Sequence, residues 1–170
     1  VCEDIWDEQI GYQEKVVDGL CERGAQMIVN INASPYHRGK GRERMKMLAS
    51  RATENSVIVT YTNTVGGQDE LVFDRQSLVI GRNGKAQTTG RQFEEDLIIA
   101  DLKVPADRRN ATRREAVRDG RIDRIMLSDR PAVKRMPLAA HRGPGPLPEC
   151  EEVYRALVLG TRDYVRKNGF

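Results

Sequence analysis

The chain has 170 residues, of which 39% are hydrophobic and 31% charged, with a formal net charge of +3. This length and composition suit one globular domain, or one domain with the edge of another, and exclude collagen, a disulfide-stabilised miniprotein and a membrane protein. Cys2, Cys21 and Cys150 are odd in number and far apart, so we expect free thiols and a cytoplasmic location. Because the sequence opens on Val1, we interpret it as a fragment of a longer protein.

Strands and helices alternate along the first part of the chain. Runs rich in β-branched residues predict buried strands at 27–32 and 57–63. Apolar residues at helical spacing predict a helix over 13–23, with Gly24 as its stop, and an amphipathic helix over 42–54. In the second helix we expect an apolar face of Met45, Leu48, Ala49 and Ala52, with Arg42, Lys46, Ser50 and Arg51 elsewhere.

The pattern changes after the second strand. Short apolar runs predict strands at 70–74 and 77–80, and because no helix fits between them we expect antiparallel pairing. The Asn-Gly pair at 83–84 is the signal of a two-residue hairpin turn, and the apolar run at 97–102 predicts a further strand. Parallel and antiparallel pairs together predict a mixed sheet in an α/β (α+β) fold.

The last third of the sequence divides into a linker and a helix. Prolines and glycines predict an extended linker over 105–148, in which 110–124 has helix-forming residues but no wide apolar face. Ten arginines lie within 108–142, interleaved with acidic residues and without an aromatic residue, which favours a solvated linker over a nucleic-acid patch. Helical spacing predicts a helix over 149–168 that stops at Gly169. Its apolar positions are Val153, Ala156, Leu157, Gly160, Tyr164 and Val165.

Cys2 is the candidate nucleophile. We place it at the end of a strand that enters a loop, which is where α/β scaffolds carry catalytic groups. Glu3 and Asp4 oppose formation of its thiolate by like-charge repulsion, so a base or cation from elsewhere has to activate it. The only histidines, His37 and His141, give a weak Cys/His pair. The alternative interpretation of Cys2 is a small buried hydrophobic residue.

A second candidate site is the polar loop at 32–40, which follows a predicted strand directly. The hydroxyl of Ser34 and the cations of Arg38 and Lys40 would suit a small zwitterion or carboxylate. The alternative is a loop that leads into a helix and leaves its cations solvated. The sequence has no phosphate-binding loop, no Cys/His metal spacing and no dinucleotide fingerprint, so we expect no metal site.

With these residues assembled, the chain resembles the glutamine-dependent NAD synthetases, whose glutaminase domain belongs to the carbon-nitrogen hydrolase (nitrilase) superfamily. Four stretches carry the resemblance: VCEDIW at 1–6, IVNINASPYHRGK at 28–40, NTVGGQDELVFD at 63–74 and QFEEDLIIADL at 92–102. The first fits the superfamily's nucleophile motif, and GGQDELVFD is typical of the synthetases rather than of nitrilases at large.

The resemblance implies a division of the chain into three parts. Residues 1–104 would be the C-terminal part of the glutaminase domain, 105–148 an Arg- and Pro-rich interdomain linker, and 149–170 the truncated first helix of the synthetase domain. The implied fold is part of a nitrilase-type four-layer α-β-β-α sandwich, followed by one helix of an α/β ATP-pyrophosphatase domain. An incomplete sandwich exposes apolar sheet faces, so we expect the isolated chain to be marginally stable or to aggregate.

The resemblance also implies roles for individual residues. Cys2 would be the nucleophile of a Glu-Lys-Cys triad that attacks the side-chain amide of glutamine, forms a thioester and releases ammonia. The backbone N–H of Glu3 would help to hold the oxyanion, while Ser34 and Lys40 would bind the α-amino and carboxylate end of glutamine. The triad's glutamate and lysine precede the nucleophile in the family, so we expect this chain alone to be inactive.

The implied partners follow from the same resemblance. L-glutamine would bind this chain, and deamido-NAD, ATP and Mg would bind the synthetase domain of a cytoplasmic, homo-oligomeric ligase of NAD biosynthesis. Within these 170 residues we expect no cofactor, and we expect neither nucleic acid nor a membrane as a partner. Two alternatives stay open: a free-standing amidase of the same superfamily, and a non-catalytic interaction module with a basic segment.

Overall fold

The structure is a computed structural model that describes residues 2–170 except 12, 14, 105–124, 126–135 and 139–142. The helix expected within 110–124 and most of the expected linker therefore lie outside the described residues. The helical elements are the 3-10 helix η1 (Cys2–Trp6) and the α-helices α1 (Asp7–Ile10), α2 (Val16–Glu22), α3 (Lys40–Glu54) and α5 (Glu149–Asn168). The strands are β1 (Met27–Asn32), β2 (Ile58–Asn63), β3 (Val65–Gln68), β4 (Leu71–Asp74), β5 (Leu78–Ile80) and β6 (Ala86–Thr89).

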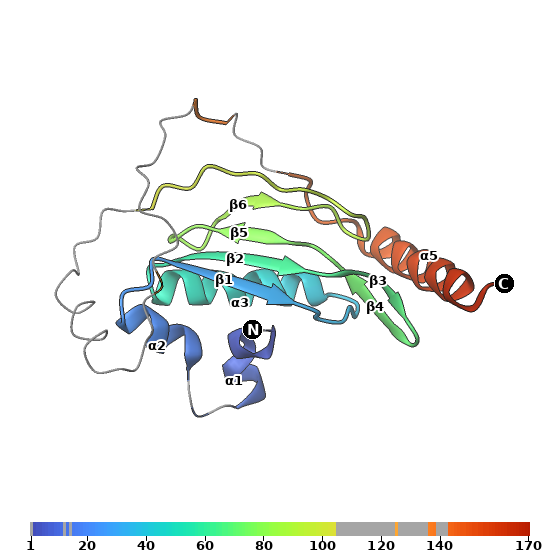
Figure 1. The fold of residues 1–170 in the computed structure, drawn as a ribbon, viewed down its shortest axis with the longest axis horizontal. Coiled ribbons are helices and arrows are strands. Elements are labelled where there is room, and N and C mark those ends of the chain that lie inside the picture. The colour runs from blue at the N-terminus through green and yellow to red at the C-terminus, as the bar shows by residue number, and fades with distance from the viewer. Residues whose placement is uncertain (1, 12, 14, 105–124, 126–135, 139–142) are drawn as a thin grey trace.

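A four-stranded mixed sheet in the order β1-β2-β5-β6 organises the fold. β1 and β2 are parallel, with Met27 opposite Ile58, while β2 with β5 and β5 with β6 are antiparallel. Figure 1 shows α3 running along one face of this sheet, with η1, α1 and α2 on the same side. The expected mixed sheet is confirmed. No helix in the described part of the chain is long and apolar enough to cross a membrane.

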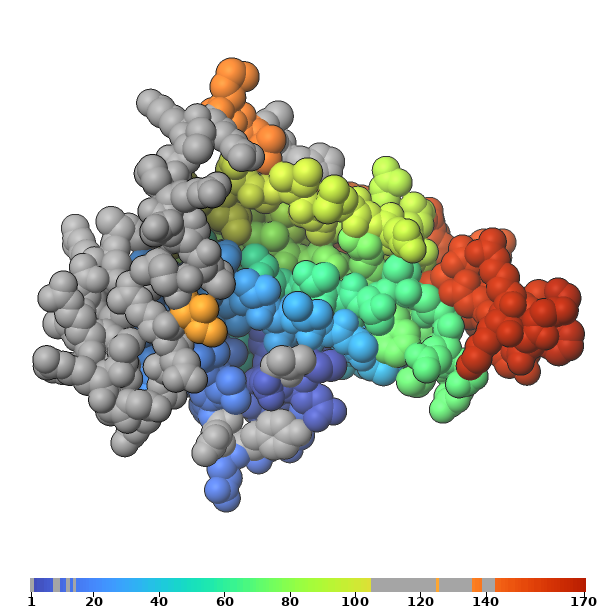
Figure 2. Space-filling model, viewed as in Figure 1, coloured from blue at the N-terminus to red at the C-terminus, as the bar shows by residue number. Residues whose placement is uncertain are grey.

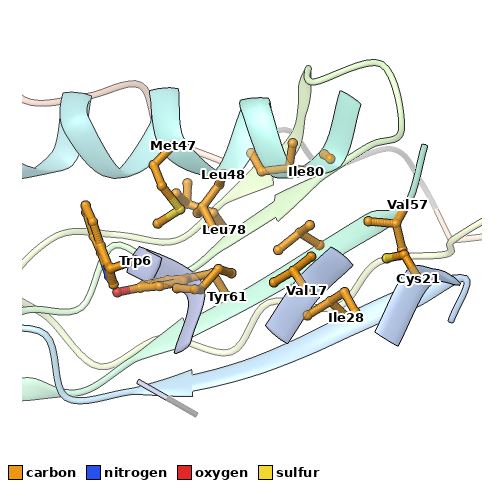
Figure 3. Close-up of a cluster of buried hydrophobic side chains, with 13 residues drawn as sticks. Trp6, Val17, Cys21, Ile28, Met47, Leu48, Val57, Tyr61, Leu78 and Ile80 are labelled. Atoms are coloured by element: carbon orange, nitrogen blue, oxygen red, sulfur yellow. The ribbon is translucent and has the colours of Figure 1, made fainter. Parts of the chain in front are cut away.

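The main core lies between the sheet and these helices. β1 alternates strictly, so that Ile28 points into the core while Val29 and Ile31 are 63% and 65% exposed on the other face. Figure 3 shows Met47 and Leu48 of α3 packed above the sheet residues. Burial of these large apolar side chains is the main term that stabilises the fold. The remaining members are Ile5, Trp6, Val17, Cys21, Ala52, Val57, Val59, Tyr61, Leu78 and Ile80.

α5 packs on a separate two-stranded sheet formed by β3 and β4. Its bounds and its stop at Gly169, where φ is 72°, are as predicted. Its predicted face is only partly right, because Ala156 is buried while Leu157 is 66% exposed. The buried positions are Glu152, Ala156 and Leu159, and Leu157 lies about 100° around the helix from Ala156. Figure 2 shows α5 at one end of the molecule, with much of its surface facing outward.

The strand predictions need three corrections. The strands predicted at 70–74 and 77–80 exist but do not pair with each other, because Arg75 and Gln76 have φ values of 60° and 35° and turn the chain from one sheet into the other. β4 pairs instead with β3, which the sequence did not predict. The strand predicted at 97–102 is wrong: it forms no ladder among the described residues, and Leu97 is 80% exposed.

The predicted turns are largely confirmed. Gly24, with a φ of 94°, follows the end of α2, although this helix begins at Val16 and not at residue 13. The hairpin at 83–84 joins β5 to β6, but only Gly84 of the pair has a positive φ. The loop closes through a hydrogen bond of 2.9 Å from the Gly81 N–H to the Lys85 carbonyl, so it is wider than the predicted two-residue turn.

Candidate functional site

Cys2 is the first residue of η1. It is also the first residue that the structure describes, so its place at the end of a strand stays a prediction. Its φ of 29° lies in the left-handed region, which costs a residue with a side chain conformational energy and recurs at functional sites. Ile5 and Trp6, both buried, fix the other end of η1 in the core. A partly exposed thiol therefore stands on a strained turn with a rigid support.

An ion pair anchors the segment directly after η1. Arg51 of α3 donates through a guanidinium nitrogen to Asp7, and both side chains are 2% exposed. The sequence prediction placed Arg51 among the residues off the apolar face, and this is wrong. A buried guanidinium requires a carboxylate partner, so the pair ties α3 to the segment that carries Cys2.

Ser34 lies two residues beyond the end of β1 and is only 6% exposed. Asn63, at the end of β2, holds its backbone from both sides. The Ser34 N–H donates to Asn63 Oδ1 at 2.8 Å, and Asn63 Nδ2 donates to the Ser34 carbonyl at 3.2 Å. The peptide groups around Ser34 are thus fixed by the neighbouring parallel strand.

Behind Asn63 lies a second buried ion pair. Arg44 of α3 donates to both carboxylate oxygens of Asp74 at 3.0 Å, and both side chains are fully buried. Asn63 Nδ2 also donates to Asp74 Oδ1, at 3.1 Å. Burial alone lowers the pKa of the Arg44 guanidinium, but the Asp74 carboxylate outweighs this effect and raises that pKa. Arg44 therefore stays charged beside the Asp74 carboxylate.

Lys40 connects the loop to the segment that carries Cys2. It is the first residue of α3, and its Nζ lies 4.0 Å from the centroid of the Trp6 ring, within range of a cation–π interaction. The backbone N–H of Glu3 belongs to the first turn of η1. The structure thus places the predicted residues Cys2, Glu3, Ser34 and Lys40 on two segments that meet where Lys40 covers Trp6.

The other polar groups of the loop face elsewhere. Arg38 is exposed, and its Nη1 lies 3.5 Å from Oε1 of Glu149 at the start of α5. His37 is exposed, and its Nε2 lies 3.6 Å from a Glu43 carboxylate oxygen. The described contacts of His37 do not include Cys2. His141 lies outside the described residues. No group of three or more His, Cys, Asp or Glu side chains in the described part of the chain is arranged to hold a metal ion.

Sequence reasoning missed the buried groups Asn63, Asp74 and Arg44. In the sequence, Asn63 is only a polar residue at the end of a strand and Arg44 only a charged residue on a helix, and such residues are common in soluble domains. Asn63 and Asp74 are the first and last residues of the NTVGGQDELVFD stretch, to which the sequence assigned no individual roles. Their proximity depends on the β3–β4 hairpin, and this was not predicted.

Comparison with known proteins identifies the class. Residues 5–109, more than half of the chain, match the carbon-nitrogen hydrolase family. The chain belongs to the carbon-nitrogen hydrolase family, and its mixed sheet with helices on one face is part of the nitrilase-type α-β-β-α sandwich.

Within that family the chain is similar to particular enzymes. It is 41% identical to a glutamine-dependent NAD(+) synthetase of Aquifex aeolicus (strain VF5), across 100% of this chain and 30% of that protein. The structure of a glutamine-dependent NAD+ synthetase from Acinetobacter baumannii, in complex with ADP, matches with a TM-score of 0.67 at 31% identity, over 99% of this chain and 26% of that chain. The chain therefore spans about a third or less of the length of these relatives.

A second kind of enzyme matches a smaller part. A mutant amidase from Nesterenkonia sp. AN1, with the acetamide moiety of fluoroacetamide added covalently at its active site cysteine, has a TM-score of 0.51 at 28% identity. This match covers 70% of this chain and 42% of the amidase.

Proposed function

We propose that this chain is part of a glutamine-dependent NAD synthetase and that its residues 1–104 contribute to glutamine hydrolysis. The observation that carries the proposal is the extent of the similarity: the synthetases match the chain across its full length, α5 included. Residues 105–148 then form the interdomain linker, and 149–170 lead into the synthetase domain.

In the proposed reaction, the Cys2 thiolate attacks the side-chain carbonyl carbon of L-glutamine. A C–S bond forms, the C–N bond breaks, and the nitrogen takes up a proton and leaves as ammonia. Water then hydrolyses the thioester to glutamate and returns the thiol. The strained backbone at Cys2 supports this role, and so does the covalent adduct on the active site cysteine of the related amidase.

Two groups are proposed to bind the amino-acid end of glutamine. Ser34 offers its hydroxyl from a backbone fixed on both sides by Asn63, and Lys40 offers a cation at the first turn of α3. The Glu3 N–H, at the first turn of η1, would donate to the oxyanion that forms on the carbonyl. In this proposal the zwitterionic end of glutamine is bound by Ser34 and Lys40, and its amide lies at the Cys2 thiol.

The remaining parts of the reaction are proposed to lie in the longer protein. A glutamate and a lysine that precede Cys2 would activate the thiol and stabilise the oxyanion. ATP and Mg²⁺ would bind the synthetase domain, where ATP activates the carboxylate of deamido-NAD for attack by ammonia. We further propose that the full-length enzyme is a cytoplasmic homo-oligomer.

The test compares two nitrogen sources in the full-length protein. We expect Cys2→Ala to lower NAD formation from glutamine at least about a thousandfold, while formation from ammonium chloride stays within about twofold of the wild type. The matched control, Cys150→Ala, removes the exposed thiol at the start of α5 and should change neither rate. Glutamine-driven synthesis that survives Cys2→Ala would refute the proposal.

The alternative is a free-standing amidase, which the Nesterenkonia match favours. That match leaves 30% of the chain uncovered, whereas the synthetase match leaves 1% uncovered. The two functions differ in product: a free-standing amidase would hydrolyse short aliphatic amides and form no NAD from deamido-NAD and ATP with either nitrogen source.

A further inference from the structure

The NTVGGQDELVFD stretch closes on itself through its two end residues. Asn63 ends β2 and Asp74 ends β4, and the β3–β4 hairpin between them brings Nδ2 of the amide to 3.1 Å from Oδ1 of the carboxylate. The same amide clamps the backbone of Ser34. A buried chain of contacts therefore runs from the motif to the loop that follows β1.

The carboxylate of Asp74 determines which way the Asn63 amide points. A carboxylate accepts hydrogen bonds and donates none, so the NH2 group of Asn63 must face Asp74 and its Oδ1 must face the Ser34 N–H. A flipped amide would place two acceptors against each other and leave the buried Ser34 N–H without an acceptor. Asp74 thus controls the orientation of Ser34 although it does not touch it.

Arg44 extends this control to the start of α3. Besides its two hydrogen bonds to Asp74, it donates to Gln76 Oε1 at 3.2 Å. Gln76 in turn packs against Gly41, since a Cβ atom added there would lie 2.4 Å from Oε1. Lys40 precedes Gly41 in the same helical turn. One buried network therefore contacts the backbone of Ser34 and the helical turn of Lys40.

We infer that Asn63, Asp74 and Arg44 form a positioning network that holds Ser34 and the helical turn of Lys40 in place for the amino-acid end of glutamine. This inference rests on the proposed function. None of the three touches Cys2 in the described contacts, so the network determines how tightly the amino-acid end is bound and leaves the chemistry at the thiol to η1.

The test uses steady-state kinetics of the full-length protein with glutamine and, separately, with ammonium. Asn63→Ala removes the clamp on Ser34 and leaves the Arg44–Asp74 pair in place. We expect it to raise the KM for glutamine at least about tenfold, with kcat lowered less than about threefold and the ammonium-driven rate unchanged. Asp74→Asn replaces one of the two acceptor oxygens by an NH2 group, so it loses a hydrogen bond from Arg44 or from Asn63 and should act in the same direction.

Arg44 supplies a graded comparison and Asp7 supplies the control. Arg44→Lys retains the charge without the two-pronged contact, so its KM for glutamine should lie between those of the wild type and Arg44→Met. Asp7→Asn breaks the other buried ion pair of α3, which does not reach Ser34. Because Asp7 supports the segment of Cys2, this variant should lower kcat with glutamine and lower thermal stability comparably, but keep the glutamine KM within about twofold of the wild type.

Each outcome decides the question. An unchanged KM in Asn63→Ala overturns the inference, as does a KM that rises equally in Asp7→Asn. If Asp74→Asn does not fold, Asn63→Ala decides alone. If the wild-type protein forms NAD from ammonium but not from glutamine, both the proposed glutaminase and this inference are overturned. If the wild type uses glutamine and the network variants have the same KM for glutamine as the wild type, only the inference is overturned.

Discussion

At the scale of single residues, two arginines of one helix hold the two segments of the site. Arg44 and Arg51 are seven residues apart on α3, which is about two turns, so they lie on the same side of the helix. Arg44 binds Asp74 behind Ser34, and Arg51 binds Asp7 beside η1. Through these two pairs, α3 contacts both the network behind Ser34 and the segment that follows Cys2.

The first prediction concerns Arg51. Arg51→Met would leave the Asp7 carboxylate buried without this partner, and loss of one member of a buried pair costs about 3–5 kcal/mol. We expect a clear fall in the urea concentration at which the hydrolase part of the full-length protein unfolds. The control is Arg91→Met, which removes an exposed ion pair with Glu94 worth less than about 1 kcal/mol. Equal effects of the two variants would contradict the burial argument.

The second prediction concerns Tyr36 and alkaline pH. Burial, followed by the nearby Glu152 carboxylate, raises the pKa of the Tyr36 phenol from 10.0 to about 12. Because the folded state holds this proton more tightly, its contribution to stability is complete below pH 10 and is lost as the pH rises towards 12. Tyr36→Phe should therefore lose less stability than the wild type between pH 10 and pH 12, as measured by the free energy of unfolding in urea at each pH.

Tyr154→Phe is the control for this pH experiment, since that tyrosine is 67% exposed on α5. An alkaline slope that is the same in Tyr36→Phe and in the wild type would contradict the assignment.

Local sequence patterns point to some residues of the candidate site and not to others. Cys2, Ser34 and Lys40 follow from local patterns and a family resemblance, and their roles stay predictions. Arg44 and Asp74 are thirty residues apart, and the local pattern of either gives only a charged residue on an amphipathic helix or at a strand end. Their burial depends on long-range pairing, which periodicity does not contain.

At the scale of elements, close contact of two glycines joins α5 to β3. A Cβ atom on Gly67 would lie 2.9 Å from Gly160 Cα, and the Gly67 N–H donates to Asp163 at 2.8 Å. Lys167 adds an exposed ion pair with Asp69 in the β3–β4 turn. The contact therefore depends on the absence of side chains at two positions far apart in the sequence.

The third prediction tests this contact. Gly67→Ala places a methyl group against the α5 backbone, so we expect α5 to separate from β3 and its amide hydrogens to exchange faster in the full-length protein. Gly145→Ala is the control, because a Cβ atom added there meets nothing within 4 Å. Unchanged exchange along α5 in Gly67→Ala would contradict the packing described.

Helices were predicted more accurately than strand pairing, for a physical reason. The helix over 149–168 has local hydrogen bonds, an apolar periodicity and a glycine stop, all visible in one segment. Strand partners are not local. The positive φ angles of Arg75 and Gln76 direct β4 and β5 into different sheets, and neither residue type indicates such angles in the sequence. The exposed apolar run at 97–102 shows that hydrophobicity without a partner does not make a strand.

At the scale of the whole molecule, one face of the mixed sheet carries exposed apolar side chains. Met27, Val29 and Ile31 of the edge strand β1 are 40%, 63% and 65% exposed on the face opposite α3. In an α-β-β-α sandwich this is the face that a second sheet covers. An exposed apolar face on an edge strand associates readily with other chains.

The fourth prediction follows for the 170-residue polypeptide expressed by itself. We expect it to lack glutaminase activity and to scatter light increasingly with concentration. The double variant Val29→Thr with Ile31→Thr keeps the β-branched shape and should reduce this scattering. Replacement of Leu157 and Val158, which are exposed on α5, by threonine is the comparison. A soluble monomer with a cooperative unfolding transition would contradict the expectation.

The central claim, that Cys2 is the nucleophile of a glutaminase, is tested most directly by covalent labelling of the full-length protein. A diazoketone analogue of glutamine loses N2 when it alkylates a thiolate at the site, and peptide mass spectrometry identifies the labelled cysteine. We predict label on Cys2, prevented by excess glutamine, and none on Cys150 although that thiol is exposed. Label on Cys150, or none on Cys2 in a protein that makes NAD from glutamine, would contradict the account.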